Sequence, residues 1–228
     1  MATKLCIMLL TYNRAEYARE TLLSTLENLE HDGDLYVHVA DDGSPGDHYI
    51  DDLVAIALDY GITQDRITTS NSQHQGYGAN YNAATQVVHM VVGDTGLVLP
   101  LEDDWRLERK LDTGPLIRLL EVAPDIGCVR LGYLGCTQEL WARYDAPGGV
   151  PIWRFNPDTP EPHVFAGHPR LERVSWERGV GPWSEGLDPG STEFEVAHRP
   201  AARRGVVWPG FVAPWGDLFS HIGTVRSY

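Results

Sequence analysis

Three consecutive carboxylates, Glu102, Asp103 and Asp104, directly follow the apolar stretch 97–101. Acidic side chains this close repel one another when ionised, so a cation or several hydrogen-bond donors must join them. A divalent metal ion is the simplest group that meets this need. A solvated acidic turn would give the same run of residues, but the position after a buried strand favours the metal site.

Asp41 and Asp42 form a second acidic pair, which follows the apolar stretch 35–40. One carboxylate could accept hydrogen bonds from the N–H groups of a nucleotide base, and the other could hold the loop through backbone amides. The alternative is an Asx-turn before Gly43, which is common in Asp-Gly sequences. The pair by itself does not decide between binding and turn formation.

Thr11, Tyr12, Asn13 and Arg14 follow a third apolar stretch, residues 5–10. Their hydroxyl, amide and guanidinium groups suit the binding of a base and a diphosphate. The same residues could instead form the N-cap region of a following helix.

These polar groups need a scaffold that brings them together, and the hydrophobic pattern predicts an α/β fold. Short apolar runs alternate with stretches in which apolar residues recur every three or four positions. The predicted strands are 5–10, 35–40, 66–69 and 97–101, and the predicted helices are 15–29, 50–57 and 79–90, with Gly61 ending the second helix. This alternation implies right-handed crossovers and a mostly parallel sheet flanked by helices. Since ligands bind at the carboxyl ends of parallel strands, we expect the polar strand ends to face one crevice.

The composition limits the partners of the chain. It carries 32 acidic residues against 18 Lys and Arg, for a net charge of −14. Such a field repels phosphate backbones, so we expect no nucleic acid partner, and an anionic ligand needs a metal ion, arginines or backbone N–H groups. The apolar runs are far shorter than the ~20 residues of a membrane span. The N-terminus lacks the layout of a signal peptide, so we expect no membrane span, a cytoplasmic location and reduced cysteines.

Four segments, in this order and at these intervals, resemble the motifs of a family 2 glycosyltransferase with the GT-A fold: 10–14, 40–44, 76–82 and 102–104. The resemblance implies a Rossmann-like sheet, a nucleotide-diphosphate sugar donor and Mn²⁺ or Mg²⁺. It also implies that Asp41 contacts the base, that Asp103 lies near the ribose or diphosphate, and that Asp104 is a metal ligand. The nucleotide-binding residues implied in this way are Thr11, Tyr12, Asn13, Arg14, Asp41, Asn71, Gly76, Asn82 and Asp103.

Two positions depart from the family pattern. Glu102 stands where the usual Asp-x-Asp motif begins, similar to the Glu-Asp-Asp variant of some N-acetylglucosaminyltransferases, and its role stays open. Tyr81 stands where the family often has an arginine. The diphosphate contact is then absent or supplied by another residue, such as Arg14.

The second half resembles the acceptor region of the same family more faintly. In that region an acid at the start of a helix is the general base, which implies this role for Glu193, with Ser191 as the helix cap. Asp188 and Glu185 are the alternative bases, and Glu193 could also be no more than a favourable first-turn acid. Trp183 and Glu185 are the expected acceptor contacts, although tryptophan is equally a large core residue.

His221 lies in a C-terminal segment rich in aromatic residues and glycine. Related enzymes complete the metal site with a C-terminal histidine, so the resemblance implies that His221 binds the cation together with Asp104. The alternative is a structural histidine.

These expectations describe a metal-dependent, inverting glycosyltransferase that moves a hexosyl or N-acetylhexosaminyl group to a hydroxyl on a glycan or protein acceptor. We interpret 1–228 as one GT-A domain, with a nucleotide-sugar-binding half, 1–110, and an irregular acceptor-binding and lid half, 111–228. Two alternatives stay open: a non-catalytic carbohydrate- or nucleotide-binding protein of the same fold, and a sugar-nucleotide nucleotidyltransferase. The latter generally needs a Gly-rich loop with Arg and Lys after the first strand, and this chain has no such loop there.

Overall fold

A computed structural model describes residues 3–46, 48–71, 73–132, 140–145, 151–156, 158, 164–209 and 218–223, with backbone alone for 140–145. Cys136 and Trp215 lie outside these residues. The two described cysteines, Cys6 and Cys128, are buried and free, as expected for reduced thiols.

The first hundred residues form a parallel sheet with crossover helices. The elements are β1 (Lys4–Thr11), α1 (Ala15–Asn28), β3 (Asp34–Asp41), α2 (His48–Asp59), β4 (Ile67–Asn71), α3 (Tyr77–Val92) and β5 (Leu97–Glu102). β1 pairs in parallel with β3 on one side and with β5 on the other, and β4 extends the sheet beyond β3. The predicted strands and helices of this half are confirmed, as is the end of α2, where Gly61 adopts a φ of 82° and donates its N–H to Leu58 O.

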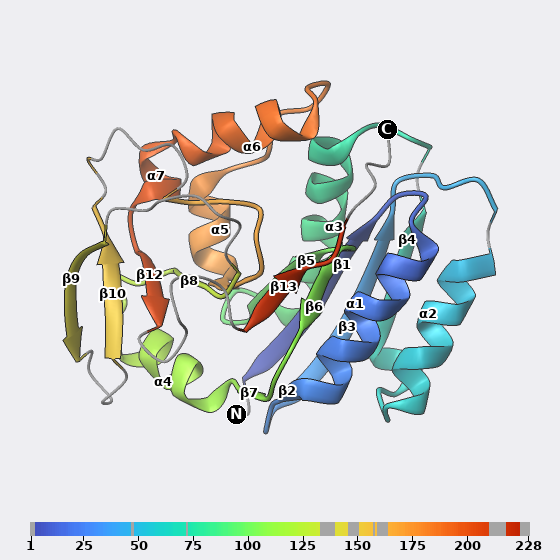
Figure 1. The fold of residues 1–228 in the computed structure, drawn as a ribbon, viewed down its shortest axis with the longest axis horizontal. Coiled ribbons are helices and arrows are strands. Elements are labelled where there is room, and N and C mark those ends of the chain that lie inside the picture. Colours follow the sequence, from blue (N-terminus) through green and yellow to red (C-terminus); the bar gives the residue numbers. More distant parts are fainter. Residues whose placement is uncertain are drawn as a thin grey trace.

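Burial explains why β1 is apolar along almost its whole length. Residues 5–9 of this strand are at most 1% exposed, because helices cover both faces of the sheet. α1 and α2 lie on one face and α3 on the other (Figure 1). The carboxyl ends of β1, β3 and β5 therefore meet at one edge of the sheet, as the sequence predicts.

The second half continues the same sheet with short strands of both directions. Its elements are α4 (Gly114–Val122), β8 (Cys128–Arg130), β9 (Leu140–Asp145), β10 (Pro151–Phe155), β11 (Arg170–Arg173), α5 (Val174–Val180), α6 (Pro189–Ala197), α7 (Pro200–Arg203) and β12 (Val206–Pro209). The strand order is β4-β3-β1-β5-β11-β8-β12-β10-β9, and β11 runs antiparallel to both of its neighbours. α6 lies across the top of the molecule near the start of α3 (Figure 1).

Two additional sheets have two strands each. β2 (Leu29–Glu30) pairs with β7 (Leu111–Asp112), and β6 (Trp105–Leu107) pairs with β13 (Phe219–His221). The second pairing brings a C-terminal segment back to the end of β5. No described helix is both long enough and apolar enough to cross a membrane.

Candidate active site

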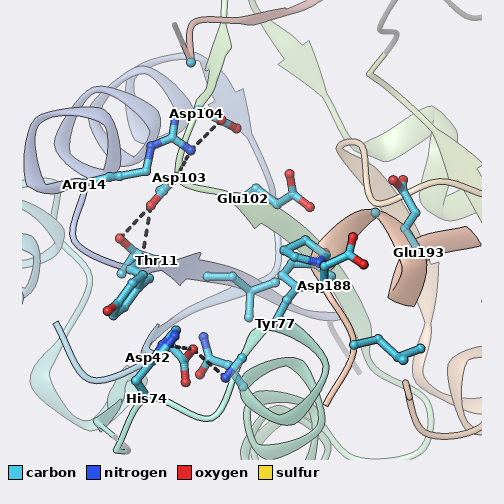
Figure 2. Close-up of a pocket in the computed structure, with 18 of the residues that line it drawn as sticks. Thr11, Arg14, Asp42, His74, Tyr77, Glu102, Asp103, Asp104, Asp188 and Glu193 are labelled. Atoms are coloured by element: carbon cyan, nitrogen blue, oxygen red, sulfur yellow. Dashed lines mark hydrogen bonds and ion pairs between the residues drawn. The ribbon is translucent and has the colours of Figure 1, made fainter. Parts of the chain in front are cut away.

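A cavity of about 1000 Å³ opens where β1, β3 and β5 end and where α3 and α6 begin. Residues named from the sequence line it from both halves of the chain, among them Thr11, Tyr12, Arg14, Gly76, Asp103, Asp104 and Glu193. His221 lines it as well, from the C-terminal segment. Figure 2 shows Glu102, Asp103 and Asp104 in the upper part of the view and the Asp42–His74 group below them.

Asp103 is held by the loop that follows β1. Its Oδ2 accepts hydrogen bonds from Thr11 Oγ1 at 2.9 Å and from the Tyr12 amide at 3.3 Å, and its Oδ1 lies 3.0 Å from Arg14 Nη1. Thr21 of α1 fixes the acidic turn from below, since its hydroxyl donates to Asp103 O at 2.8 Å. Burial raises the pKa of Asp103 to about 7, although Arg14 opposes the shift.

Asp104 meets both Arg14 and His221. Its Oδ2 lies 2.7 Å from Arg14 Nη1 and 3.2 Å from His221 Nε2, while its Oδ1 is buried and has no hydrogen-bond partner. The backbone keeps the histidine in place, because the amide of Ile222 donates to Asp104 O at 2.8 Å. The chain segments thus bring together two residues that are 117 positions apart in the sequence.

This pair fits a divalent cation. Neighbouring ligands of an octahedral ion at about 2.1 Å stand about 3 Å apart, close to the separation of His221 Nε2 and Asp104 Oδ2. The unpartnered Oδ1 of Asp104 offers a further oxygen. Among the described residues no three His, Cys, Asp or Glu side chains converge on one point, so ligand oxygens would have to complete the coordination.

Asp41 and Asp42, at the end of β3, lie in different surroundings. The one that faces the cavity is not the one expected from the sequence. Asp41 is 1% exposed and does not line the cavity, because its carboxylate accepts hydrogen bonds from the Ser44 amide at 2.8 Å and from the Ser44 and Tyr49 hydroxyls. Asp42 lines the cavity. Of the two carboxylates, the structure thus places Asp42, and not Asp41, at the cavity wall.

Asp42 organises the loop that leads into α3. It accepts hydrogen bonds from the amides of Gln75 and Gly76, both at 2.9 Å, and its Oδ2 lies 2.8 Å from His74 Nδ1. The His74 ring stacks on Tyr12, with centroids 4.1 Å apart and an angle of 17° between the planes. A carboxylate and an aromatic pair thus line the end of the cavity farthest from Glu193 (Figure 2).

The other end of the cavity holds a second group of oxygens. Glu193 of α6 accepts a hydrogen bond from the Gly167 amide. A Cβ placed on Gly167 would lie 2.9 Å from Glu102 Oε1, 3.2 Å from the Tyr77 hydroxyl and 3.3 Å from Glu193 Oε1, so these three oxygens converge. Burial, with the nearby charges of Glu193 and Asp104, raises the pKa of Glu102 to about 8.

The start of α6 corrects one expectation. Asp188, not Ser191, is the N-cap, and its carboxylate accepts the Ser191 amide at 3.0 Å. Glu193 is then the fifth residue of the helix and lies beyond the first turn, so the argument from the helix dipole does not apply to it. Its hydrogen bond to Gly167 takes over the positioning role. Asp188 also lines the cavity, but it is exposed and bound to its own helix.

Comparison with known proteins gives the family. The model of glycosyl transferase family 2 matches residues 6–175, well over half of the chain. The chain belongs to glycosyl transferase family 2. No functionally curated protein matches it.

Solved structures show the same GT-A fold at low sequence identity. S. aureus TarS in complex with UDP-GlcNAc is 13% identical with a TM-score of 0.65, over 98% of this chain and 62% of that chain. GalNAc-T7 with UDP, GalNAc and Mn²⁺ is 14% identical with a TM-score of 0.58, over 94% and 45%. Mannosyltransferase PcManGT from Pyrobaculum calidifontis with GDP-Man and Mn²⁺ is 16% identical with a TM-score of 0.53, over 91% and 57%. The chain spans less than two thirds of the length of each of these proteins.

Besides Asp41, five residues expected at the site do not line the cavity. They are Asn13, Asn71, Asn82, Trp183 and Glu185. Asn13 shapes the turn before α1: it has a φ of 52°, and its amide donates to Ser44 Oγ at 2.6 Å. Asn71 ends β4 opposite Asp41.

The other three residues join α3 to the segment before α6. Asn82 donates to Trp183 O at 2.9 Å and to Glu185 Oε1 at 2.8 Å, and it accepts the Trp183 amide. The Trp183 side chain is 2% exposed and stacks on Tyr81 at 4.3 Å. The expectation that Trp183 stacks on an acceptor sugar is therefore wrong in this structure, and tryptophan's core role applies.

Tyr81, at the position where family 2 often has arginine, belongs to a buried network. Arg170 donates to the Tyr81 hydroxyl at 2.6 Å and to Glu172 Oε2 at 2.8 Å, and all three side chains are at most 1% exposed. Arg170 also donates to Gly167 O at 3.2 Å. An arginine from the second half thus supports the loop that holds Glu193, while Arg14 is the arginine that faces the cavity.

His74, Tyr77 and Asn80 line the cavity although no role is expected for them from the sequence, and the last two lie within the 76–82 segment. Gly76, with a φ of 90°, turns the chain into α3 and aims its first turn at the cavity. The glycine marks this turn in the sequence, but only the fold shows which side chains after it face inward.

Proposed function

We propose that the protein is a metal-dependent, inverting glycosyltransferase that moves a sugar from a nucleotide-diphosphate sugar to an acceptor hydroxyl. One observation carries the proposal: a single cavity holds a cation-compatible pair, Asp104 and His221, and a carboxylate suited to be the base, Glu193. A nucleotide site with neither group would fit a binding protein better.

The donor would lie along the cavity from the Asp42 end toward Glu193. Asp42 can accept a base N–H, and the Tyr12–His74 stack offers an aromatic face to the base. Arg14 and Asp103 follow on the neighbouring strand ends, where the diphosphate and ribose would pass. TarS with UDP-GlcNAc and PcManGT with GDP-Man, both of the same fold, support a nucleotide-sugar donor.

Asp104 and His221 would hold Mn²⁺ or Mg²⁺ together with diphosphate oxygens. When bound, the ion offsets the charge that develops on the leaving diphosphate. Arg14 would add a positive charge on the same side. A protein of net charge −14 can thus bind an anionic donor.

Glu193 would act as the general base. Its carboxylate takes the proton of the acceptor hydroxyl while that oxygen attacks the anomeric carbon, and the bond from this carbon to the diphosphate oxygen breaks. The electron pair of that bond leaves with the nucleotide diphosphate. Attack from the face opposite the leaving group inverts the anomeric configuration.

The transferred group in this proposal is a hexosyl or N-acetylhexosaminyl group. The acceptor is a hydroxyl of a glycan or protein, and the location is cytoplasmic. The nucleotidyltransferase alternative has less support, because the described loop after β1 has no lysine and no glycine.

The test is a thermal-shift screen with UDP, GDP, dTDP and CDP, with and without Mn²⁺, followed by an assay for nucleotide release from the matching nucleotide sugar. A nucleotide at 100 times its dissociation constant adds about 2.7 kcal/mol of stability. Binding with metal-dependent release of nucleotide supports the proposal. Binding without release under any acceptor or metal condition would favour a non-catalytic binding protein.

A further inference from the structure

Buried polar atoms without partners gather in the wall of the cavity. Four lining residues carry such an atom: Arg14 Nε, Tyr77 OH, Asn80 Oδ1 and Asp104 Oδ1. Folded proteins pair nearly all buried polar atoms, because an unpaired one costs free energy. Their concentration in one cavity indicates that a polar ligand supplies the missing partners.

The four atoms form two groups that differ in charge. Arg14 and Asp104 carry opposite charges and lie on the loops after β1 and β5, where the diphosphate and cation are proposed. Tyr77 and Asn80 are neutral and lie three residues apart in the first turn of α3, so they share one helix face. The second group therefore suits a neutral ligand group that offers hydrogen bonds of both kinds.

Neither the Tyr77 hydroxyl nor Asn80 Oδ1 takes part in a hydrogen bond within α3. Asn80 is 5% exposed, and its Nδ2 donates to Ala40 O at 3.1 Å, which leaves Oδ1 as a free acceptor. The Tyr77 ring packs edge-on against Trp183 with centroids 5.4 Å apart. Its hydroxyl faces the oxygens of Glu102 and Glu193 and interacts with the Glu102 carboxylate, but it makes no hydrogen bond of regular geometry to a described residue. Burial raises the pKa of Tyr77 well above its usual value, so the phenol stays a donor.

The position of this face is also informative. Figure 2 shows Tyr77 between the Asp42–His74 group and the Glu102–Glu193 group. In the proposed donor orientation the nucleotide occupies the first group, and the acceptor oxygen approaches the second. The part of the donor that lies between them is the transferred sugar.

We propose that Tyr77 and Asn80 form the subsite for the transferred sugar, in which the Tyr77 hydroxyl and Asn80 Oδ1 hydrogen-bond its neutral oxygen and N–H groups. This inference rests on the proposed function, and it assigns recognition of the sugar to the first turn of α3. Nucleotide recognition stays with the loops after β1 and β3.

The experiment compares each nucleotide with its sugar conjugate. Dissociation constants for UDP, UDP-GlcNAc, UDP-glucose, GDP and GDP-mannose are measured by calorimetry with Mn²⁺, for the wild type, Tyr77→Phe and Asn80→Ala. Loss of one hydrogen bond predicts a sugar conjugate about 3- to 10-fold weaker, with the nucleotide alone unchanged. Tyr60→Phe is the matched control, because Tyr60 lies outside the cavity and its hydroxyl bonds Glu27 on the surface.

Stability separates this role from a structural one. Tyr77→Phe removes only an unpartnered hydroxyl, so its melting temperature without ligand is expected to equal or exceed that of the wild type. Asn80→Ala also loses the bond to Ala40 O and melts lower, but the ratio of the two dissociation constants still reports the sugar contact. A lower melting temperature for Tyr77→Phe, or equal weakening of nucleotide and conjugate, would overturn the inference. A wild type that binds no nucleotide would instead overturn the proposed function.

Discussion

Asp41 and Asp42 are neighbours in the sequence, yet their carboxylates lie on opposite sides of one turn and contact different residues. Successive residues of an extended strand point in opposite directions, and here only Asp42 faces the cavity. Asp41 points to Ser44 and Tyr49, and Asp42 points to His74 and the start of α3. The sequence predicts that one acid binds and one holds the loop, but it does not say which.

Substitution at these two positions separates their roles. Asp42→Ala removes the acceptor of two amides and of a ligand N–H, so we expect nucleotide binding to weaken by about 1.5–3 kcal/mol. Asp41→Ala leaves the buried Ser44 amide and the Tyr49 hydroxyl without the carboxylate that accepts their hydrogen bonds. We therefore expect the free energy of unfolding to fall by about 1–3 kcal/mol. Calorimetry with UDP and urea denaturation measure the two effects. A reversed pattern would return the base contact to Asp41.

Glu193 gives the sharpest prediction about chemistry. Glu193→Gln keeps the shape of the side chain and can still accept the Gly167 amide, but it cannot take a proton. We expect turnover to fall by roughly 10² to 10⁴-fold while nucleotide affinity stays unchanged. Asp188→Asn is the comparison variant, because Asp188 lies in the same cavity wall and can cap α6 as asparagine. If Asp188→Asn loses more turnover than Glu193→Gln, the base is Asp188.

At the level of elements, the first half of the sheet follows from the sequence and the second does not. β1 and β5 are apolar over five residues or more, β3 is interrupted only by His38 between Leu35 and Ala40, and the helices between them have clear periodicity. β8, β11 and β12 have three or four residues each, too few for a period to show. β11 also enters between β5 and β8, so its place depends on long-range pairing that no local pattern encodes.

The pairing of β13 with β6 is the element that completes the candidate metal site. Gly223 lies just after β13, and a Cβ at this position would collide with both Asp104 Oδ2 and Arg14 Nη2. Glycine therefore permits the close approach that keeps His221 near Asp104.

Two substitutions test this arrangement. His221→Ala removes a ligand, whereas Gly223→Ala keeps both ligand side chains and pushes the segment away from Asp104 through the clash with its Oδ2. We expect both to raise the Mn²⁺ concentration needed for half-maximal activity and to weaken the mutual enhancement between Mn²⁺ and nucleotide, measured by calorimetry. We expect little change of stability for His221→Ala, because His221 is exposed. His198→Ala is the control, because His198 is an exposed histidine at the C-cap of α6. Full activity in excess chelator would exclude the metal role.

At the scale of the whole molecule, both halves of the chain supply the cavity: the first half through the ends of β1, β3 and β5, and the second half through α6 and the segment around β13. The chain order of the motifs predicts the end of the cavity formed by β1, β3 and β5, because those elements follow one another. Gly167, which holds Glu193, and Arg170, which supports that loop, come from the second half and carry no recognisable spacing. The sequence therefore identifies the donor side more fully than the acceptor side.

A buried histidine on β3 makes the stability of the whole fold depend on pH. His38 of β3 is 0% exposed, between the Thr68 and Ser70 hydroxyls, and burial lowers its pKa from 6.5 to about 4. Between these two values the unfolded chain binds a proton that the folded chain does not, so the free energy of unfolding falls as the pH falls. At 1.36 kcal/mol per pH unit the loss from this residue is about 3 kcal/mol, fully present below about pH 4 and absent above about pH 7.

Urea denaturation at pH 7.5, 6, 5 and 4.5 measures this effect, with His38→Gln as the reference. Glutamine keeps hydrogen-bonding groups for Thr68 but does not titrate, so every other acid and base contributes equally to both proteins. We expect the free energy of unfolding of the wild type to fall steadily relative to that of the variant as the pH falls below 6.5. A difference that is constant over this range would mean that His38 takes up its proton in the folded state as readily as in the unfolded one.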